Sequence, residues 1–178
     1  MRCVAEGALP VAPGTTRVVA LPTGLALAGG EPAGLGANVT LHQSDTALYL
    51  RFDPVWRTGR VESAFLVFDP AAGSVAGADV ELEVFRVRRA WRGTAFAWRE
   101  QPGFAPPFAR GIARAQPALP IRIDVTELVR FAADHPGRDH GFAVRAASGG
   151  PTGVTIATGS AGGSAPKLDV YLSAGGGR

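Results

Sequence analysis

Apolar side chains recur at every second position along most of this chain, and that spacing decides the fold class. In residues 46–52, Leu48, Leu50 and Phe52 fall on one face of an extended strand. A period of two is typical of a strand with one buried face. The pattern predicts nine or ten strands in these segments: residues 17–21, 25–28, 38–42, 46–52, 64–68, 80–84, 121–125, 142–145, 154–156 and 168–172.

One segment has a helical pattern instead and predicts a short helix over Thr126–His135. Asp124 or Thr126 can cap its start, and Glu127 suits the positive end of the helix dipole. Pro136 and Gly137 then end it. The predicted buried stripe is Leu128, Val129, Phe131 and Ala132.

These elements predict an all-β fold, a jelly-roll β-sandwich of two antiparallel sheets with one short helix. The 178 residues suit one domain, and 24 glycines with 14 prolines suit a protein of strands and loops. We expect an N-terminal extension with edge strands over residues 1–37, the sandwich over residues 38–173 and a glycine-rich tail over residues 174–178. Residues 149–151 and 159–163 are expected to be loops.

Arginine dominates the basic residues, because only Lys167 among the 18 is lysine. A GC-rich genome would produce this bias, and so would a surface that binds carboxylate or sulfate groups. The net charge of +3 is modest and does not indicate a nucleic-acid partner. No segment is apolar and long enough to predict membrane insertion. Pro10 and Pro13 interrupt the N-terminus, so no signal peptide is evident.

Residues that carry catalytic or metal chemistry are sparse. Cys3 is the only cysteine, and His42, His135 and His140 lack metal-ligand spacing. Glu81 and Glu83 share a strand face, which we interpret as a solvated surface. Calcium at loop oxygens near Asp53 or Asp69 is a weaker alternative. We therefore expect no enzyme, no cofactor and no metal site.

Several motifs resemble, in order and spacing, the DNRLRE-type domain, a jelly-roll family related to disaggregatase and to alginate-binding modules. They are YLRFD (49–53), VESAFLVF (61–68), VFRVRRAW (84–91), FAW (96–98), IDVTELV (123–129), HGFAVRA (140–146) and PKLDVYL (166–172). The family usually has an acidic residue after the first Trp and an Asn-rich turn after the second, where this chain has Arg92 and Arg99-Glu100. The resemblance implies a non-catalytic module with an extracellular or cell-surface location.

The strand phase suggests candidate binding residues on the faces that point away from the core. If the apolar stripes point inward, Tyr49, Phe65 and Phe85 point outward as an exposed aromatic patch. They are candidates for stacking on sugar rings. The patch would be a ligand platform, a subunit interface or the floor beneath the N-terminal segment. Candidates to meet carboxylates are Arg51, Arg86, Arg88 and Arg145. Trp91 and Trp98 suit either core packing, which we favour, or sugar stacking.

Two functions fit these observations. The first is a non-catalytic, carbohydrate-binding-like module that recognises a polysaccharide, neutral or anionic. The alternative is a structural or decorating subunit of a protein assembly, such as a surface layer, a filament or a phage-like particle, built through the sandwich. The expected partner is therefore a polysaccharide or a protein, and the second function implies a homo- or hetero-oligomer.

Overall fold

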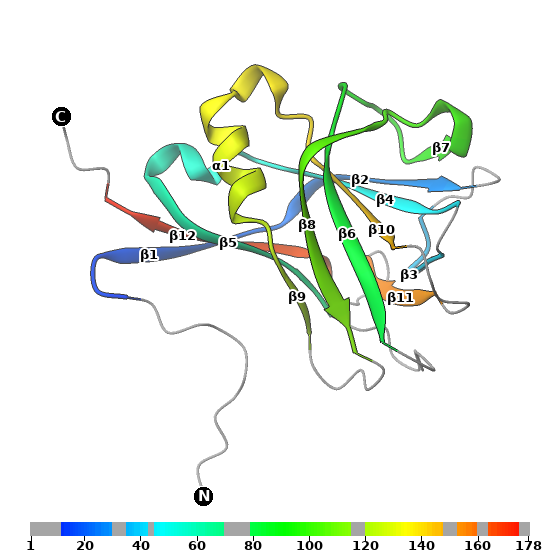
Figure 1. The fold of residues 1–178 in the computed structure, drawn as a ribbon, viewed down its shortest axis with the longest axis horizontal. Helices are drawn as coiled ribbons and strands as arrows, with labels where there is room; N and C mark the ends of the chain where they lie inside the picture. Colours follow the sequence, from blue (N-terminus) through cyan, green and yellow to red (C-terminus); the bar gives the residue numbers. More distant parts are fainter. Residues whose placement is uncertain are drawn as a thin grey trace, which may run out of the picture.

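Two β-sheets face each other across one hydrophobic core (Figure 1). The computed structural model describes residues 12–29, 35–42, 45–69, 79–114, 120–147, 153–159 and 164–174. The four-stranded sheet has the order β1 (Thr15–Ala20), β12 (Lys167–Ser173), β5 (Arg60–Phe68), β9 (Ile121–Asp124). The six-stranded sheet has the order β7 (Ala95–Ala97), β2 (Pro22–Gly29), β4 (Ala47–Phe52), β10 (Phe142–Ala146), β6 (Val80–Val87), β8 (Phe104–Ala113). A third sheet pairs β3 (Asn38–Leu41) with β11 (Val154–Ala157).

The core lies between the sheets, where the alternating apolar side chains meet. Leu48 and Leu50 of β4 and Leu82 of β6 are fully buried there, opposite Leu66 of β5 and Leu168 of β12. The predicted all-β sandwich is therefore confirmed, and all ten predicted strands are present. The sheets are not wholly antiparallel, however, because β7 runs parallel to β2.

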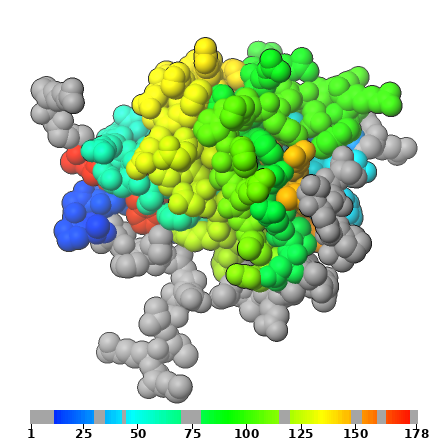
Figure 2. Space-filling view, in the orientation of Figure 1, coloured from blue at the N-terminus to red at the C-terminus, as the bar shows by residue number. Residues whose placement is uncertain are grey.

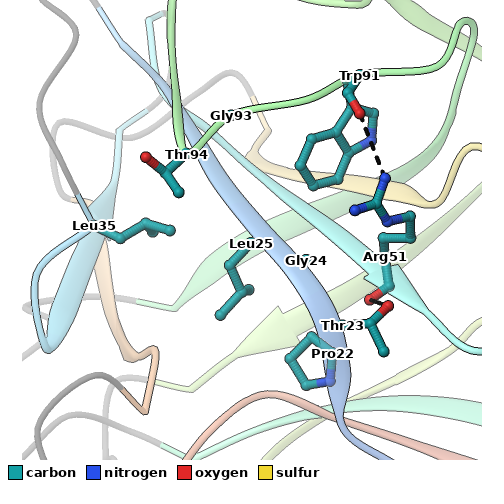
Figure 3. Close-up of a pocket in the computed structure, with 9 residues that line it drawn as sticks. All are labelled: Pro22, Thr23, Gly24, Leu25, Leu35, Arg51, Trp91, Gly93 and Thr94. Carbon is teal, nitrogen blue, oxygen red and sulfur yellow. Dashed lines mark hydrogen bonds between the residues drawn. The ribbon is translucent and has the colours of Figure 1, made fainter.

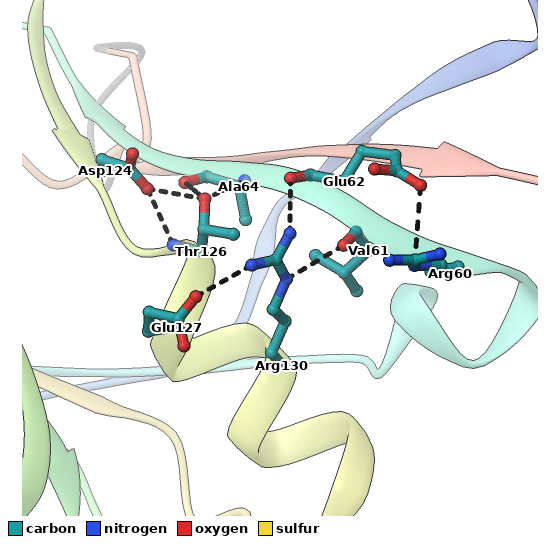
Figure 4. Close-up of polar contacts among 8 residues, drawn as sticks. All are labelled: Arg60, Val61, Glu62, Ala64, Asp124, Thr126, Glu127 and Arg130. Carbon is teal, nitrogen blue, oxygen red and sulfur yellow. Dashed lines mark hydrogen bonds and ion pairs between the residues drawn. The ribbon is translucent and has the colours of Figure 1, made fainter.

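The helix α1 (Thr126–Asp134) ends one residue before the predicted end and packs against β5 and β8. Three of the four predicted stripe residues are buried, and Phe131 is half-buried. Asp124 Oδ1 accepts hydrogen bonds from the Thr126 N–H at 2.9 Å and the Thr126 hydroxyl at 2.6 Å. Arg130 donates to the carbonyls of Val61 and Glu62, so the helix is also fixed to β5 (Figure 4).

Two strands were not predicted from the alternation. β7 has only three residues, too few to show a period. β8 contains Pro106 and Pro107, which argue against a central strand. The structure resolves this conflict by placing β8 at the edge of the six-stranded sheet, with a register shift between Phe85 and Arg86 of its partner β6.

The predicted domain boundary near residue 37 does not separate two parts of the fold. β1 pairs with β12 and β2 pairs with β4, so residues 15–29 belong to the sandwich. The expectation of edge strands holds for β1, whereas β2 lies inside its sheet. The predicted loop at residues 149–151, residues 160–163 of the predicted loop at 159–163, and residues 175–178 of the predicted tail lie outside the described residues.

Gly141 offers a test of how tightly β10 is attached to β4. Its φ is +87°, and a Cβ there would lie 2.2 Å from the Leu50 carbonyl oxygen. We expect Gly141→Ala to lower the free energy of unfolding by about 2 kcal/mol or more, because it adds backbone strain to a clash. Urea denaturation measures this change. Gly137→Ala is the control: nothing lies within 4 Å of that position, so a similar loss there would contradict the prediction.

Candidate functional site

The outer face of the six-stranded sheet carries a second, smaller hydrophobic cluster. Its floor consists of fully buried alanines from β2, β4 and β10, together with Tyr49: Ala26, Ala28, Ala47 and Ala143. Residues 88–103, which we call the covering loop, fold over this floor. Trp91, Phe96 and Trp98 of the covering loop pack on it, as does Phe104 at the start of β8. The floor needs small side chains because the aromatic rings occupy the space above them.

Tyr49 is therefore not an exposed stacking residue, and that prediction is wrong. The ring is fully buried and meets the rings of Trp91 and Phe96 edge-on, at centroid distances of 6.0 and 5.4 Å. Its hydroxyl donates to Gln101 Oε1 at 2.9 Å. Burial raises the pKa of Tyr49, and the charge of Arg89 opposes that rise. The favoured packing role of Trp91 is confirmed, and Trp98 packs partly buried against the same cluster.

Arg51 and Trp91 line a pocket of about 460 Å³ at the edge of this cluster (Figure 3). The guanidinium of Arg51 lies 5.1 Å from the centre of the Trp91 ring. One of its nitrogens donates to the Trp91 carbonyl at 3.4 Å. Gly24 leaves room for this arrangement, since a Cβ there would lie 3.0 Å from an Arg51 nitrogen. Thr23 and Thr94 line the same pocket, and the Thr23 hydroxyl donates to the Arg51 carbonyl at 3.3 Å (Figure 3).

The three loops beside this pocket leave the six-stranded sheet at one end. Phe142, the first residue of β10, pairs with Leu50 near the end of β4 and with Arg86 near the end of β6. Three loops are therefore attached at this end of the sheet: residues 53–59, the covering loop and residues 135–141. The last two lie along the top of Figure 1. Trp91 ties two of them together, because its indole N–H donates to the His140 carbonyl at 2.8 Å.

Arginines without an acidic partner gather in these loops and at the strand ends beneath them. We call this set the arginine rim: Arg51, Arg57, Arg86, Arg88, Arg89, Arg92, Arg99 and Arg138. Within the described parts of the chain, none of these has a carboxylate oxygen within 4.0 Å. The other described arginines all form ion pairs: Arg17, Arg60, Arg110, Arg114, Arg122, Arg130 and Arg145.

Burial is the main cause of two pKa shifts in and beside the rim, and neighbouring positive charges act on both groups. Burial, and next the charge of Arg138, lower the pKa of Arg86. Burial also raises the pKa of Asp139, which disfavours negative charge in one of the three loops; the Gly141 N–H, His140 and Arg57 oppose that rise. The other acidic residues in the loops are Asp53 and Glu100. The rim therefore presents a positive surface that the protein itself leaves largely unneutralised.

The structure separates the predicted carboxylate-binding residues into two groups. Arg51, Arg86 and Arg88 lie in the arginine rim. Arg86 is partly used inside the protein: its guanidinium lies 3.7 Å from the Phe131 ring centre and donates to the Pro106 carbonyl at 2.7 Å. Arg145 instead forms an ion pair with Glu83 at 2.9 Å. The close spacing of Arg88, Arg89 and Arg92 in the sequence is a signal for the rim, but of these three only Arg88 was predicted as a binding residue.

The three predicted aromatic residues do not form one patch. Phe65 lies on β5 in the four-stranded sheet, whereas Tyr49 and Phe85 lie in the six-stranded sheet. Phe65 is half-buried beneath Arg122, whose guanidinium is 4.2 Å from its ring centre. The expectation of adjacent outward aromatics is therefore wrong, because residues with the same strand phase belong to opposite faces of the sandwich.

Phe85 stands in a row of stacked rings rather than flat on the sheet. Its centroid lies 5.0 Å from that of Phe104 and 5.6 Å from that of Phe108, with interplanar angles of 20° and 29°. Nearly parallel rings at these separations are offset-stacked, with each ring partly covering the face of the next. The Arg145 guanidinium also lies 5.0 Å from the Phe85 centroid. The faces of Phe85 are thus occupied inside the protein, which leaves little of them for a sugar ring.

Glu83 is not on a solvated strand face as predicted, because it is buried between two arginines. One carboxylate oxygen accepts from Arg110 at 3.2 Å and the other from Arg145 at 2.9 Å. Asp69, one of the two predicted calcium positions, lies 3.3 Å from Lys167. Among the described residues, no group of three or more His, Cys, Asp or Glu side chains is arranged to hold a metal ion.

Tyr49 links the covering loop to an alkaline pH dependence of stability. Its pKa is raised in the folded protein, so the folded state favours the neutral phenol. The contribution of the Tyr49 phenol to the free energy of unfolding is therefore fully present below pH 10. It falls as the pH rises above that value, by up to about 1.4 kcal/mol per pH unit. We expect Tyr49→Phe to lower the free energy of unfolding by about 1 kcal/mol at neutral pH, because the variant lacks the hydroxyl that bonds to Gln101. This variant should lose less stability than the native chain between about pH 9 and 11.5. Urea denaturation across this range measures both effects, and parallel alkaline losses would contradict the prediction.

Comparison with known proteins leaves the family unassigned. No family model and no curated protein sequence matches this chain. The described residues contain no helix long and apolar enough to cross a membrane. The resemblance to the DNRLRE-type domain stays a prediction, and the site must be interpreted from its own geometry.

Proposed function

We propose that this chain is a non-catalytic module that binds an anionic polysaccharide along the arginine rim. The observation that carries the proposal is the segregation of the arginines. Those with acidic partners lie on strands, on α1 or directly after β8, and of these Arg60 borders the loop at residues 53–59. Those without described partners lie in three adjacent loops and at the strand ends beside them. An anionic ligand would supply the negative charge that the rim lacks.

The chemistry of guanidinium supports a carboxylate- or sulfate-bearing ligand. Its planar array of N–H groups can donate two parallel hydrogen bonds to such an anion. Arg51 has most of its donors available, because its described contacts are a single 3.4 Å hydrogen bond and the Trp91 ring. The hydroxyl of Thr94 in the same pocket suits the hydroxyl groups of a sugar unit, and the Thr23 oxygen can accept from one while it donates to the Arg51 carbonyl. A polymer could then continue over the arginines of the loops.

An anionic polymer fits these residues better than a neutral one. Neutral glycans depend on exposed aromatic faces. Tyr49 is buried, and the faces of Phe85 are occupied by Phe104, Phe108 and Arg145. The proposal includes an extracellular or cell-surface location, because anionic polysaccharides of cell walls and matrices are found there.

Binding to defined polysaccharides tests the proposal. We expect the chain to bind alginate or pectate at low salt, to weaken steeply as salt is added, and not to bind dextran. We expect Arg88→Gln with Arg92→Gln to weaken binding by roughly tenfold, because two exposed ionic contacts of about 0.7 kcal/mol each are lost. Isothermal titration calorimetry measures the affinities.

The matched control removes the same charge from arginines that already have partners. Arg110 and Arg114 are exposed but paired, Arg110 with Glu81 and Glu83 and Arg114 with Asp79, at the end of β8 away from the covering loop. Arg110→Gln with Arg114→Gln should change the affinity less than twofold. Equal losses in both double variants would show that only net charge matters and would contradict a rim site. Equal binding of single-stranded DNA would contradict a preference for polysaccharide.

The predicted alternative, a structural subunit of an assembly, is favoured by a different observation. Phe108 and Ile112 of β8 are exposed to 50% and 49% on the same outer face of the six-stranded sheet, with Arg110 between them. Exposed apolar neighbours of this kind often mark protein contacts. Under this alternative, light scattering would find particles larger than a dimer, and Phe108→Asp would dissociate them. Particles no larger than a dimer would exclude it.

A further inference from the structure

We propose that two copies of this chain associate through β1, which pairs antiparallel with its own symmetry mate. The two four-stranded sheets would then continue into each other across a twofold axis. This inference is independent of the polysaccharide site, because β1 lies in the other sheet from Arg51 and the covering loop. In Figures 1 and 2, β1 is the blue segment at the left margin of the molecule.

β1 has one neighbour only. It pairs with β12 along its whole length, from Thr15 opposite Ser173 to Ala20 opposite Leu168, and no described strand pairs with its other side. A strand edge of this kind presents backbone N–H and C=O groups to a pairing partner. Val19 in β1 is 46% exposed, and Leu21 directly after it is 60% exposed. Additional apolar surface thus lies beside the free edge.

The other edges of the two main sheets have features that oppose pairing. β7 is only three residues long. β8 contains Pro106 and Pro107, and its register shifts opposite Arg86. β9 packs against β8, where a Cβ on Gly111 would lie 2.6 Å from a side-chain carbon of Ile123. Natural proteins protect edges with short strands, prolines and covering elements, and β1 has none of these within Thr15–Ala20.

The one charge in β1 is held away from its free edge. Arg17 reaches across to Asp169 of the neighbouring β12, with a nitrogen–oxygen distance of 2.8 Å. A charged residue on an edge strand usually prevents pairing by projecting toward an incoming strand. Here the ion pair with Asp169 directs that charge back over the sheet.

The occupant that fits this edge is a second copy of β1. With the twofold axis at Val18, the two copies of Val18 lie opposite each other. Arg17 of each copy then lies opposite Val19 of the other copy. Arg17 and Val19 share the outer face, so the aliphatic part of Arg17 would cover the exposed Val19. Val18 already packs against the core from the inner face, so the pairing would extend that core. No two like charges would face each other.

Sedimentation of the full chain tests the proposal. We expect a reversible monomer–dimer equilibrium in the micromolar range. Val19→Lys should raise the dimer dissociation constant at least tenfold, because pairing would cover an ammonium group, instead of an apolar side chain, with the aliphatic part of Arg17 of the other copy. Ile112→Lys is the control, since Ile112 is exposed to nearly the same degree, 49% against 46%, on the other sheet. This control should leave the dissociation constant unchanged.

Cysteine cross-linking tests the register without relying on the lysine variant. In a Cys3→Ser background, Val18→Cys should form an intermolecular disulfide under mild oxidation, since the two residues face each other across the axis. Thr16→Cys should not, because the two copies of that residue would lie about four residues apart along the paired strands, roughly 13 Å.

Three outcomes would overturn the proposal. A chain that stays monomeric at high micromolar concentration would show that β1 does not pair with itself. A dimer that Ile112→Lys dissociates and Val19→Lys does not would place the contact on β8. A monomer that becomes a dimer only after residues 1–11 are removed would show that the chain's own N-terminal residues occupy the edge.

Discussion

The packing of the covering loop on the alanine floor is the interaction on which the rest of this surface depends. The rings that contact the Tyr49 ring belong to Trp91, Phe96 and Phe104, and its hydroxyl bonds to Gln101, so the burial of Tyr49 depends on the position of the covering loop and of the start of β8. Burying an aromatic side chain is worth roughly 2 kcal/mol or more, which exceeds the contribution of any single polar contact here. The backbone that carries the arginines of the loop is held in place because Trp91 is buried and Phe96 and Trp98 are partly buried on the floor.

Cross-strand neighbours in the six-stranded sheet explain why one arginine on its outer face is ion-paired and another is not. Arg145 and Arg51 both project from the outer face of the six-stranded sheet. Arg145 lies opposite Glu83 on β6, so its charge is neutralised within the sheet. Arg51 lies opposite Gly24 on β2, which offers space but no charge. The residue on the neighbouring strand therefore decides whether an arginine on this face is held in an ion pair or is available to bind a ligand.

Alternation along the sequence predicted the strands well because each buried face is a local property. It predicted the inner faces of β4, β5, β6 and β12, and the helix to within one residue. It could not predict what lies above an outer face, because Tyr49 is covered by residues more than 40 positions later in the chain. β8 was missed for the related reason that an edge strand tolerates prolines, and edge position is a property of the whole sheet.

The candidate site was only partly predictable for the same reason. Arg51, Arg86 and Arg88 were predicted from strand phase, and they lie in the rim. Arg57 and Arg138 come from two other loops and join the rim only through the pairing of β4, β6 and β10. The ion pairs could not be predicted from the sequence either. Glu83 and Arg145 are 62 positions apart, and no sequence pattern distinguishes Arg145 from Arg51.

The pairing of Thr15 with Ser173 has a mechanical consequence. Because these residues are opposite each other in antiparallel strands, polypeptide attached before β1 and after β12 would leave the sandwich from nearly the same point. A tension applied through both attachments would pull the two strands apart from that end. The backbone hydrogen bonds between them would then break one after another instead of sharing the load. The same geometry would let the sandwich be inserted into a loop of a host protein without forcing the ends of that loop apart.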